Sequence, residues 1–117
     1  MAEQRRYRRI DVDLDGIVTF SRTNSTVICA IHDISREGRG VKIVTSDPRI
    51  CAKEDVNLAI LIPTDSSPVK CAGRITWYSE DEDPFRVGKA YVAGVLITDM
   101  STIDQKRLEF AIDRSKV

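Results

Sequence analysis

The sequence predicts a mainly β fold: a six-stranded antiparallel barrel, Greek-key-like in its connections, that ends in an α-helix. Three observations lead to this prediction. Six short apolar runs, many of them β-branched, alternate with clusters of turn-forming residues. The last stretch instead shows the three-to-four-residue spacing of a helix. The length of 117 residues suits one compact domain with a single core.

Each expected strand is an apolar run that turn residues separate from the next run. The six expected strands are Leu14–Arg22, Val27–Ile34, Gly40–Thr45, Asp55–Ile62, Val69–Tyr78 and Tyr91–Thr98. The residues Thr23, Asn24 and Ser25 predict a turn between the first two strands. Gly94 inside the last strand predicts a bulge or a point of close approach.

The C-terminal helix is predicted from a start signal and a spacing. Ser101 and Asp104 form the serine-x-x-acid pattern of a capping box. Leu108, Ala111 and Ile112 then recur at helical spacing. We therefore expect a helix over about residues 101–113, which plugs one end of the barrel or packs on its outside.

The charges balance overall but are unevenly placed along the chain. Lys and Arg total 18, Asp and Glu also total 18, and the formal net charge is zero. This balance argues against a generic nucleic-acid or membrane binder. Residues 1–9 nevertheless carry four arginines, and residues 80–83 are all acidic. We expect a flexible basic arm over residues 1–9, a single barrel domain over 10–117, and an acidic loop at 80–83.

The cysteines and the hydropathy argue against a disulfide-bonded, metal-binding or membrane-spanning protein. The sequence has three cysteines, Cys29, Cys51 and Cys71, and no CxxC pair. The odd number argues against a disulfide framework, and the missing pair argues against a metal site. No apolar run approaches the ~20 residues that span a bilayer. We expect a cytoplasmic protein without direct membrane insertion.

Catalysis finds no support in the sequence. His32 is the one histidine, and it is followed by Asp33 and Ser35. Neighbouring residues of a strand point to opposite faces, so these three cannot form a triad. No phosphate-binding glycine loop or nucleophile elbow is present either. The sequence predicts no enzyme and no cofactor.

A polar platform is predicted where the second expected strand ends. Asp33 and Ser35 are two residues apart, so their side chains project on one face. Ser35 and Gly38 fit the first and last positions of a type I turn, with Arg36 and Glu37 at its tip. A carboxylate, a hydroxyl and a glycine suit a ligand that approaches the backbone, although the same residues are ordinary in a hairpin.

The composition of the basic arm suits a segment that binds a nucleotide, and it also suits a solvated tail. It reads Arg5, Arg6, Tyr7, Arg8 and Arg9, with arginine in place of lysine throughout. Guanidinium groups bind phosphate through two parallel hydrogen bonds, bind guanine O6 and N7, and stack on flat bases. The composition favours a ligand with both phosphates and purine rings.

Together the two motifs resemble a known family. Arg5-x-x-x-Arg9, followed by Asp33-x-Ser35-x-x-Gly38, is similar to the paired signature of the PilZ domain family, bacterial receptors for the second messenger cyclic di-GMP (c-di-GMP). The stretch Gly73–Trp77 resembles that family's strand ending in tryptophan. Ala93–Ile97 resembles its Gly-Val-x-Phe strand, with Ile97 in place of the usual aromatic residue. The resemblance covers about residues 4–113.

The resemblance implies a role for each motif residue. Arg5 and Arg9 would grip guanine edges and phosphates. Asp33 and Ser35 would contact a guanine base and its surroundings, and Gly38 would let the backbone pass close to the ligand. Gln4 stands where family members that bind a stacked pair of c-di-GMP molecules tend to carry an arginine. The resemblance therefore leaves open whether each chain binds one or two c-di-GMP molecules. Arg6 and Arg8 are not motif positions.

The implied function is a c-di-GMP receptor and adaptor whose arm orders onto the barrel when ligand binds. The signal would pass by contact with an unidentified protein in motility or biofilm control, from a monomer or a homodimer. Two alternatives stay open. One is a ligand-independent adaptor of the same fold. The other is a single-strand nucleic-acid barrel, which the acidic run at 80–83 and the few aromatic residues disfavour.

Overall fold

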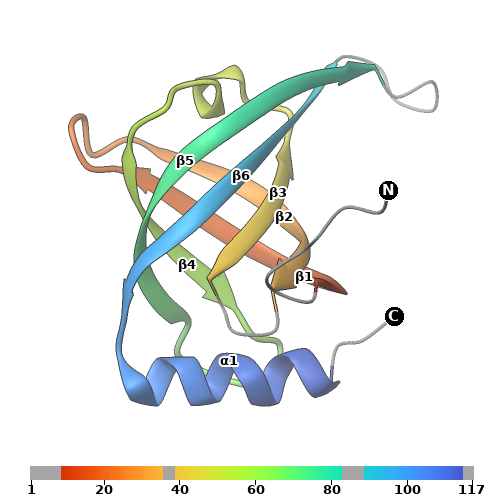
Figure 1. The fold of residues 1–117 in the computed structure, drawn as a ribbon, viewed down its shortest axis with the longest axis vertical. Coiled ribbons are helices and arrows are strands. Elements are labelled where there is room, and N and C mark those ends of the chain that lie inside the picture. The colour runs from red at the N-terminus through yellow and green to blue at the C-terminus, as the bar shows by residue number, and fades with distance from the viewer. Residues whose placement is uncertain (1–8, 36–38, 83–88, 115–117) are drawn as a thin grey trace, which may run out of the picture.

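The computed structural model describes residues 9–35, 39–82 and 89–114, and within these ranges it is a closed barrel followed by a helix (Figure 1). The elements are β1 Arg9–Phe20, β2 Thr26–Ser35, β3 Gly40–Thr45, the 3-10 turn η1 Pro48–Ile50, β4 Asp55–Leu61, β5 Val69–Glu82, β6 Lys89–Met100 and α1 Thr102–Arg114. All strand pairs are antiparallel, in the order β1-β2-β3-β6-β5-β4 around the barrel. The predicted fold class is confirmed.

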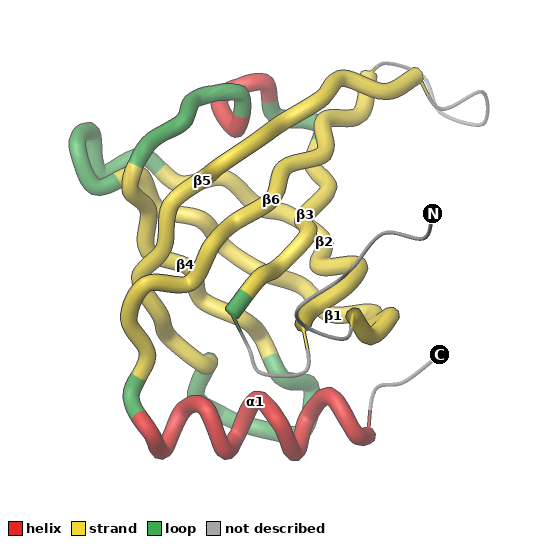
Figure 2. The backbone as a smooth tube through the Cα atoms, in the orientation of Figure 1, coloured by secondary structure: helices red, strands yellow, loops and turns green. Residues whose placement is uncertain are grey.

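The core fills the barrel because apolar and polar residues alternate along the strands. In β3, for example, Val41, Ile43 and Thr45 are buried while the residues between them are half-buried. The helix α1 lies across one end of the barrel (Figure 2) and buries Leu108 and Ala111 there, together with Ile112. Leu108 and Ile112 join the same cluster as the barrel residues, so strands and helix share one core.

β1 at its start and β5 at its end run well beyond the strands that the sequence predicts. β1 begins at Arg9, so this last residue of the expected arm is also the first residue of the barrel. β5 continues to Glu82, which places Glu80 and the next two acidic residues in a strand and not in a loop. Pairing with β6 explains this correction, since Glu80 lies 3.0 Å from the ammonium group of Lys89. Residues 83–88, with the rest of the acidic run, lie outside the described residues.

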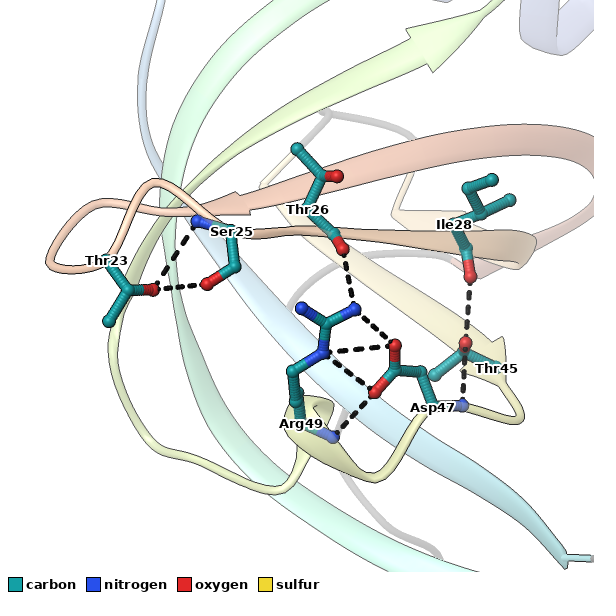
Figure 3. Close-up of polar contacts among 7 residues, drawn as sticks. All are labelled: Thr23, Ser25, Thr26, Ile28, Thr45, Asp47 and Arg49. Atoms are coloured by element: carbon teal, nitrogen blue, oxygen red, sulfur yellow. Dashed lines mark hydrogen bonds and ion pairs between the residues drawn. The ribbon is translucent and has the colours of Figure 1, made fainter.

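Side chains fix the connection from β3 to β4 at the end of the barrel far from α1 (Figure 3). The Thr45 hydroxyl donates to the carbonyl oxygen of Ile28 at 2.8 Å and accepts from the Asp47 N–H at 3.2 Å. The Asp47 carboxylate accepts from the Arg49 N–H, and the Arg49 guanidinium donates to the carbonyl oxygen of Thr26 at 3.0 Å. These bonds tie the start of η1 to β2.

The helix starts where the capping pattern predicts. The Ser101 hydroxyl accepts from the Asp104 N–H at 3.1 Å. The Asp104 carboxylate does not return to the cap: it accepts from the Lys70 N–H of β5 at 3.2 Å and from Arg107 at 2.7 Å. Asp104 thus fastens α1 to the barrel. In the part of the chain that the structure describes, no helix is long and apolar enough to cross a membrane.

Two cysteines belong to the core. The thiols of Cys29 and Cys71 are both buried and free. Burial raises the pKa of each to about 12, with a smaller contribution from Asp15 for Cys29 and from Asp104 for Cys71. Both thiols are therefore protonated at neutral pH and pack as small apolar groups.

Candidate ligand-binding site

Strand pairing brings the two sequence motifs together. Arg9 is the cross-strand partner of Ser35, and Asp11 is the partner of Asp33. The residue pair between them, Ile10 and Ile34, is buried. The end of the arginine motif therefore meets the start of the second motif on neighbouring strands. Arg5, Gly38 and the tip of the expected turn lie outside the described residues.

Ser35 shapes the hairpin between β2 and β3. Its hydroxyl accepts hydrogen bonds from the N–H groups of Arg39 at 2.8 Å and Gly40 at 3.0 Å. The carbonyl oxygen of Arg39 in turn accepts from the Ile97 N–H of β6 at 2.8 Å. Ser35 is itself buried. Its hydroxyl thus fixes the chain as it returns to β3, and contact with a guanine stays a prediction.

A β-bulge sets the position of Asp33. β2 has one more residue than β3 between Ile31 and Asp33, and this extra residue is His32. Ile31 and Ile34 are both buried, so simple alternation along β2 breaks at this point. The rule of opposite faces used for His32 therefore does not hold here. His32 is exposed, while the Asp33 side chain is only 13% exposed.

One row of residues crosses five strands at this level of the barrel. The carboxylate of Asp33 lies 3.9 Å from the ammonium group of its cross-strand partner Lys42. The row consists of Asp11, Asp33, Lys42, Gly94 and Trp77. It therefore joins two carboxylates and a lysine to an aromatic side chain.

Gly94 provides the room that Trp77 needs. A Cβ atom added at Gly94 would overlap the Trp77 indole. A bulge in β5 between Ile75 and Trp77 places the tryptophan opposite this glycine. The close approach predicted at Gly94 is confirmed. The indole is 40% exposed, so it offers an apolar ring beside the polar part of the row.

Sequence reasoning missed three members of this row as site residues. Lys42 and Asp11 belong to no motif. Both alternate with apolar neighbours that are buried, and this pattern was the one signal that places their side chains on the outer face of the barrel. Trp77 was linked to the family pattern alone, because the bulge that aligns it with Asp33 leaves no mark in the sequence. Within the described ranges, no three His, Cys, Asp or Glu side chains cluster as metal ligands would.

The fold and this row define a small antiparallel barrel with a polar and aromatic platform at the β2–β3 hairpin. The model of the PilZ domain family matches residues 3–114, and the chain belongs to this family. No curated protein matches the sequence.

Several solved structures have the same fold. The PilZ domain of YcgR from Escherichia coli, described with c-di-GMP, superposes with a TM-score of 0.70 at 15% identity, over 96% of this chain and 93% of that one. The Bacillus subtilis inhibitor of motility MotI (DgrA) gives 0.65 at 19% identity, and the c-di-GMP-dependent transcription factor MrkH gives 0.73 at 14%. Each of these two matches covers 97% of this chain and 52% of the other, so this chain spans about half their length.

Proposed function

We propose that this protein is a bacterial receptor for c-di-GMP that acts as an adaptor and not as an enzyme. The observation that carries the proposal is the pairing of Arg9 with Ser35, because it joins both halves of the PilZ signature on adjacent strands. The description of the YcgR domain with c-di-GMP supports the choice of ligand.

The chemistry of each side chain suits part of this ligand. Arg5 and Arg9 would bind guanine O6 and N7 and the phosphates, as guanidinium groups do. The Asp33 carboxylate would accept hydrogen bonds from the N–H groups of guanine, which are donors on its pairing edge. Lys42 places a cation beside this carboxylate, at 3.9 Å, and would add attraction for phosphate.

Trp77 would serve as an apolar surface for a base. It lies in the same row as Asp33 and leaves 40% of its surface exposed. Stacking of a base on an aromatic ring contributes about 1–3 kcal/mol. Since Trp77 is the one tryptophan of the chain, its fluorescence would report binding directly.

Binding would order the basic arm. Arg9 already belongs to β1, so ordering the four arm residues Arg5 to Arg8 would cost roughly 4–8 kcal/mol, at about 1–2 kcal/mol per residue. Each charge-assisted hydrogen bond returns about 1.5–3 kcal/mol. Several such bonds must therefore form together, and losing one arginine would remove much of the affinity.

Calorimetric titration with c-di-GMP tests the proposal on the full chain. Arg9→Ala and Asp33→Ala should each weaken binding by about tenfold or more, since each removes at least one charge-assisted bond. Arg22→Ala is the matched control: this arginine is exposed beyond the end of β1, away from the row, and its loss should leave binding unchanged. No heat from the intact chain, or equal binding by all four proteins, contradicts the proposal.

The same titration separates the alternatives. A ligand-independent adaptor would show no heat and no rise in its unfolding temperature with c-di-GMP, because a specific ligand must stabilise the folded state. A nucleic-acid barrel would bind short single-stranded oligonucleotides with strong dependence on salt.

A further inference from the structure

Beyond its first turn, which contains Asp104, the charges of α1 are separated onto two sides of the helix. Lys106, Arg107 and Arg114 line a groove of about 670 Å³ between α1 and residues 62–65. Glu109 and Asp113 line a smaller hollow of about 200 Å³, together with Ile10 and Ile112. The first side is therefore basic and the second acidic.

The basic groove also contains an exposed aromatic ring. Phe110 is 64% exposed, although the helix already packs on the barrel through three buried apolar residues, Leu108, Ala111 and Ile112. The Arg114 guanidinium lies 5.5 Å from the centre of the Phe110 ring, and this cation–π contact stabilises the ring at the groove. Ile62 and Ala111 add apolar lining. Aromatic and arginine side chains are the types that contribute most to protein interfaces.

The opposite wall of the groove is fastened to the helix. Arg107 lies 3.1 Å from the carboxylate of Asp65 and 2.7 Å from that of Asp104. Its guanidinium also donates to the carbonyl oxygens of Ser67 and Pro68, so the loop that follows β4 is held along α1. The groove is therefore a preformed feature, and it would not need to be built when a partner binds.

The remaining charges of the groove select the kind of partner. Asp65 is the one acidic residue among its described lining residues, and Arg107 pairs with it and with the neighbouring Asp104, so two carboxylates stand against the three basic side chains. Lys106 and Arg114 then leave a net positive groove around Phe110. Complementary charge steers partners and rejects those of like charge. An anionic partner with a large apolar side chain fits both properties of the surface.

We propose that the groove between α1 and residues 62–65 docks a segment of a partner protein that carries acidic residues and a large apolar side chain. The apolar side chain packs against Phe110, and the acidic residues face Lys106 and Arg114. This inference deepens the proposed function, since it names the surface through which the receptor reaches its partner. The role of the groove in signalling rests on the proposed function, whereas the docking of a partner segment does not.

The probe for this surface is a phage-displayed library of short random peptides, selected on the intact protein. Enriched peptides should be net negative and contain a large apolar residue. Synthesised with a fluorescent label, they should bind Phe110→Ser, and the double variant Lys106→Glu with Arg114→Glu, at least about tenfold more weakly than the intact protein. The matched control, Glu109→Gln with Asp113→Asn, alters the other side of α1 and should leave peptide binding unchanged.

Other results overturn the assignment. Enriched peptides without net negative charge, or equal binding by the groove variants, contradict it. A dimer that Phe110→Ser dissociates, measured by light scattering, would assign the groove to a second copy of the chain. Binding to phosphatidylglycerol vesicles that needs Lys106 and Arg114 would assign it to a lipid surface. Trp77 fluorescence in titrations with c-di-GMP, measured on the same variants, tests the proposed receptor function. Peptide binding tests the groove, so the two proposals can fail separately.

Discussion

Two buried hydroxyl groups make hydrogen bonds to the backbone at the two ends of β3. Ser35 accepts two backbone N–H groups where the chain enters β3, and Thr45 donates to one backbone group and accepts from another where the chain leaves it. Ser35 and Thr45 are the buried polar residues of the described chain. The Ser35 end adjoins the candidate ligand site, and the Thr45 end does not.

The pair allows a structural role of Ser35 to be separated from its role in binding. Ser35→Ala removes the acceptor of two part-buried N–H groups and should lower the free energy of unfolding by about 1–3 kcal/mol, at about 0.5–1.5 kcal/mol per hydrogen bond. Thr45→Val should cost about the same, since it also removes two hydrogen bonds. Urea unfolding measures both losses. In calorimetry with c-di-GMP, Ser35→Ala should bind more weakly while Thr45→Val binds as the intact chain does; equal affinities would show that the hairpin shape has no part in binding.

The pairing of β5 with β6 depends on a side chain packed over a glycine. Trp77 follows the bulge in β5 and covers Gly94 in β6. Further along, both strands continue beyond the barrel as a two-stranded ribbon (Figure 1), with Glu80 and Lys89 as one cross-strand ion pair. Trp77 itself lies in the barrel wall, because its partner Gly94 also pairs with Lys42 of β3.

Gly94→Ala should displace the indole from this position. The new Cβ would overlap the ring, and such overpacking costs about 1–3 kcal/mol. We expect a lower free energy of unfolding together with a shift of Trp77 emission to longer wavelength, as the ring becomes more exposed to water. Gly16→Ala is the control: its Cβ would meet the flexible end of Ile31 at 2.9 Å, away from the tryptophan. An unchanged emission in Gly94→Ala, or the same shift in Gly16→Ala, contradicts this account.

For the whole molecule, the two core thiols make stability depend on pH in the alkaline range. The pKa of Cys29 and of Cys71 is raised by burial to about 12 in the folded protein, against 9.0 without burial. The unfolded chain therefore loses these protons first as the pH rises above 9, and the folded state loses stability until about 12. Each thiol contributes about 1.4 kcal/mol per pH unit within this window.

Urea unfolding at pH 8 and pH 10 under reducing conditions measures this effect. The intact chain should lose about 2–3 kcal/mol more between the two conditions than the double variant Cys29→Ala with Cys71→Ala. All other titrating groups are common to the two proteins, so the difference isolates the two thiols. Equal losses would mean that neither thiol is protected by burial.

The architecture was predictable from the sequence because local signals agree with it. Turn residues separate the strands, and the Ser101 cap starts the helix. The start of β1 could also have been found, since Ile10 to Asp15 alternates apolar and acidic residues without a break. The extension of β5 could not: Glu80 and its acidic neighbours form a strand only because β6 pairs with them.

The candidate site was predictable as a set of residue types and less so as a geometry. The motifs select Arg9, Asp33 and Ser35, and strand pairing places them on adjacent strands. Neither the bulge at His32 nor the one before Trp77 follows from local sequence, because each arises from the register with a partner strand. Those two bulges decide which residues share the row, so Lys42 and Trp77 became visible only in the fold.

Closure of the barrel has a consequence for the order in which the protein folds. The hairpins β1–β2 and β5–β6 join segments that are near in sequence, whereas β3 pairs with β6, as in Gly40 with Leu96. Such distant pairing requires the closure of a long loop before any of its contacts form, and proteins dominated by it fold in milliseconds to seconds. During synthesis the ring stays open until β6 has left the ribosome. Until then the hairpin with Ser35 lacks the bond from Ile97 that ties it to the wall.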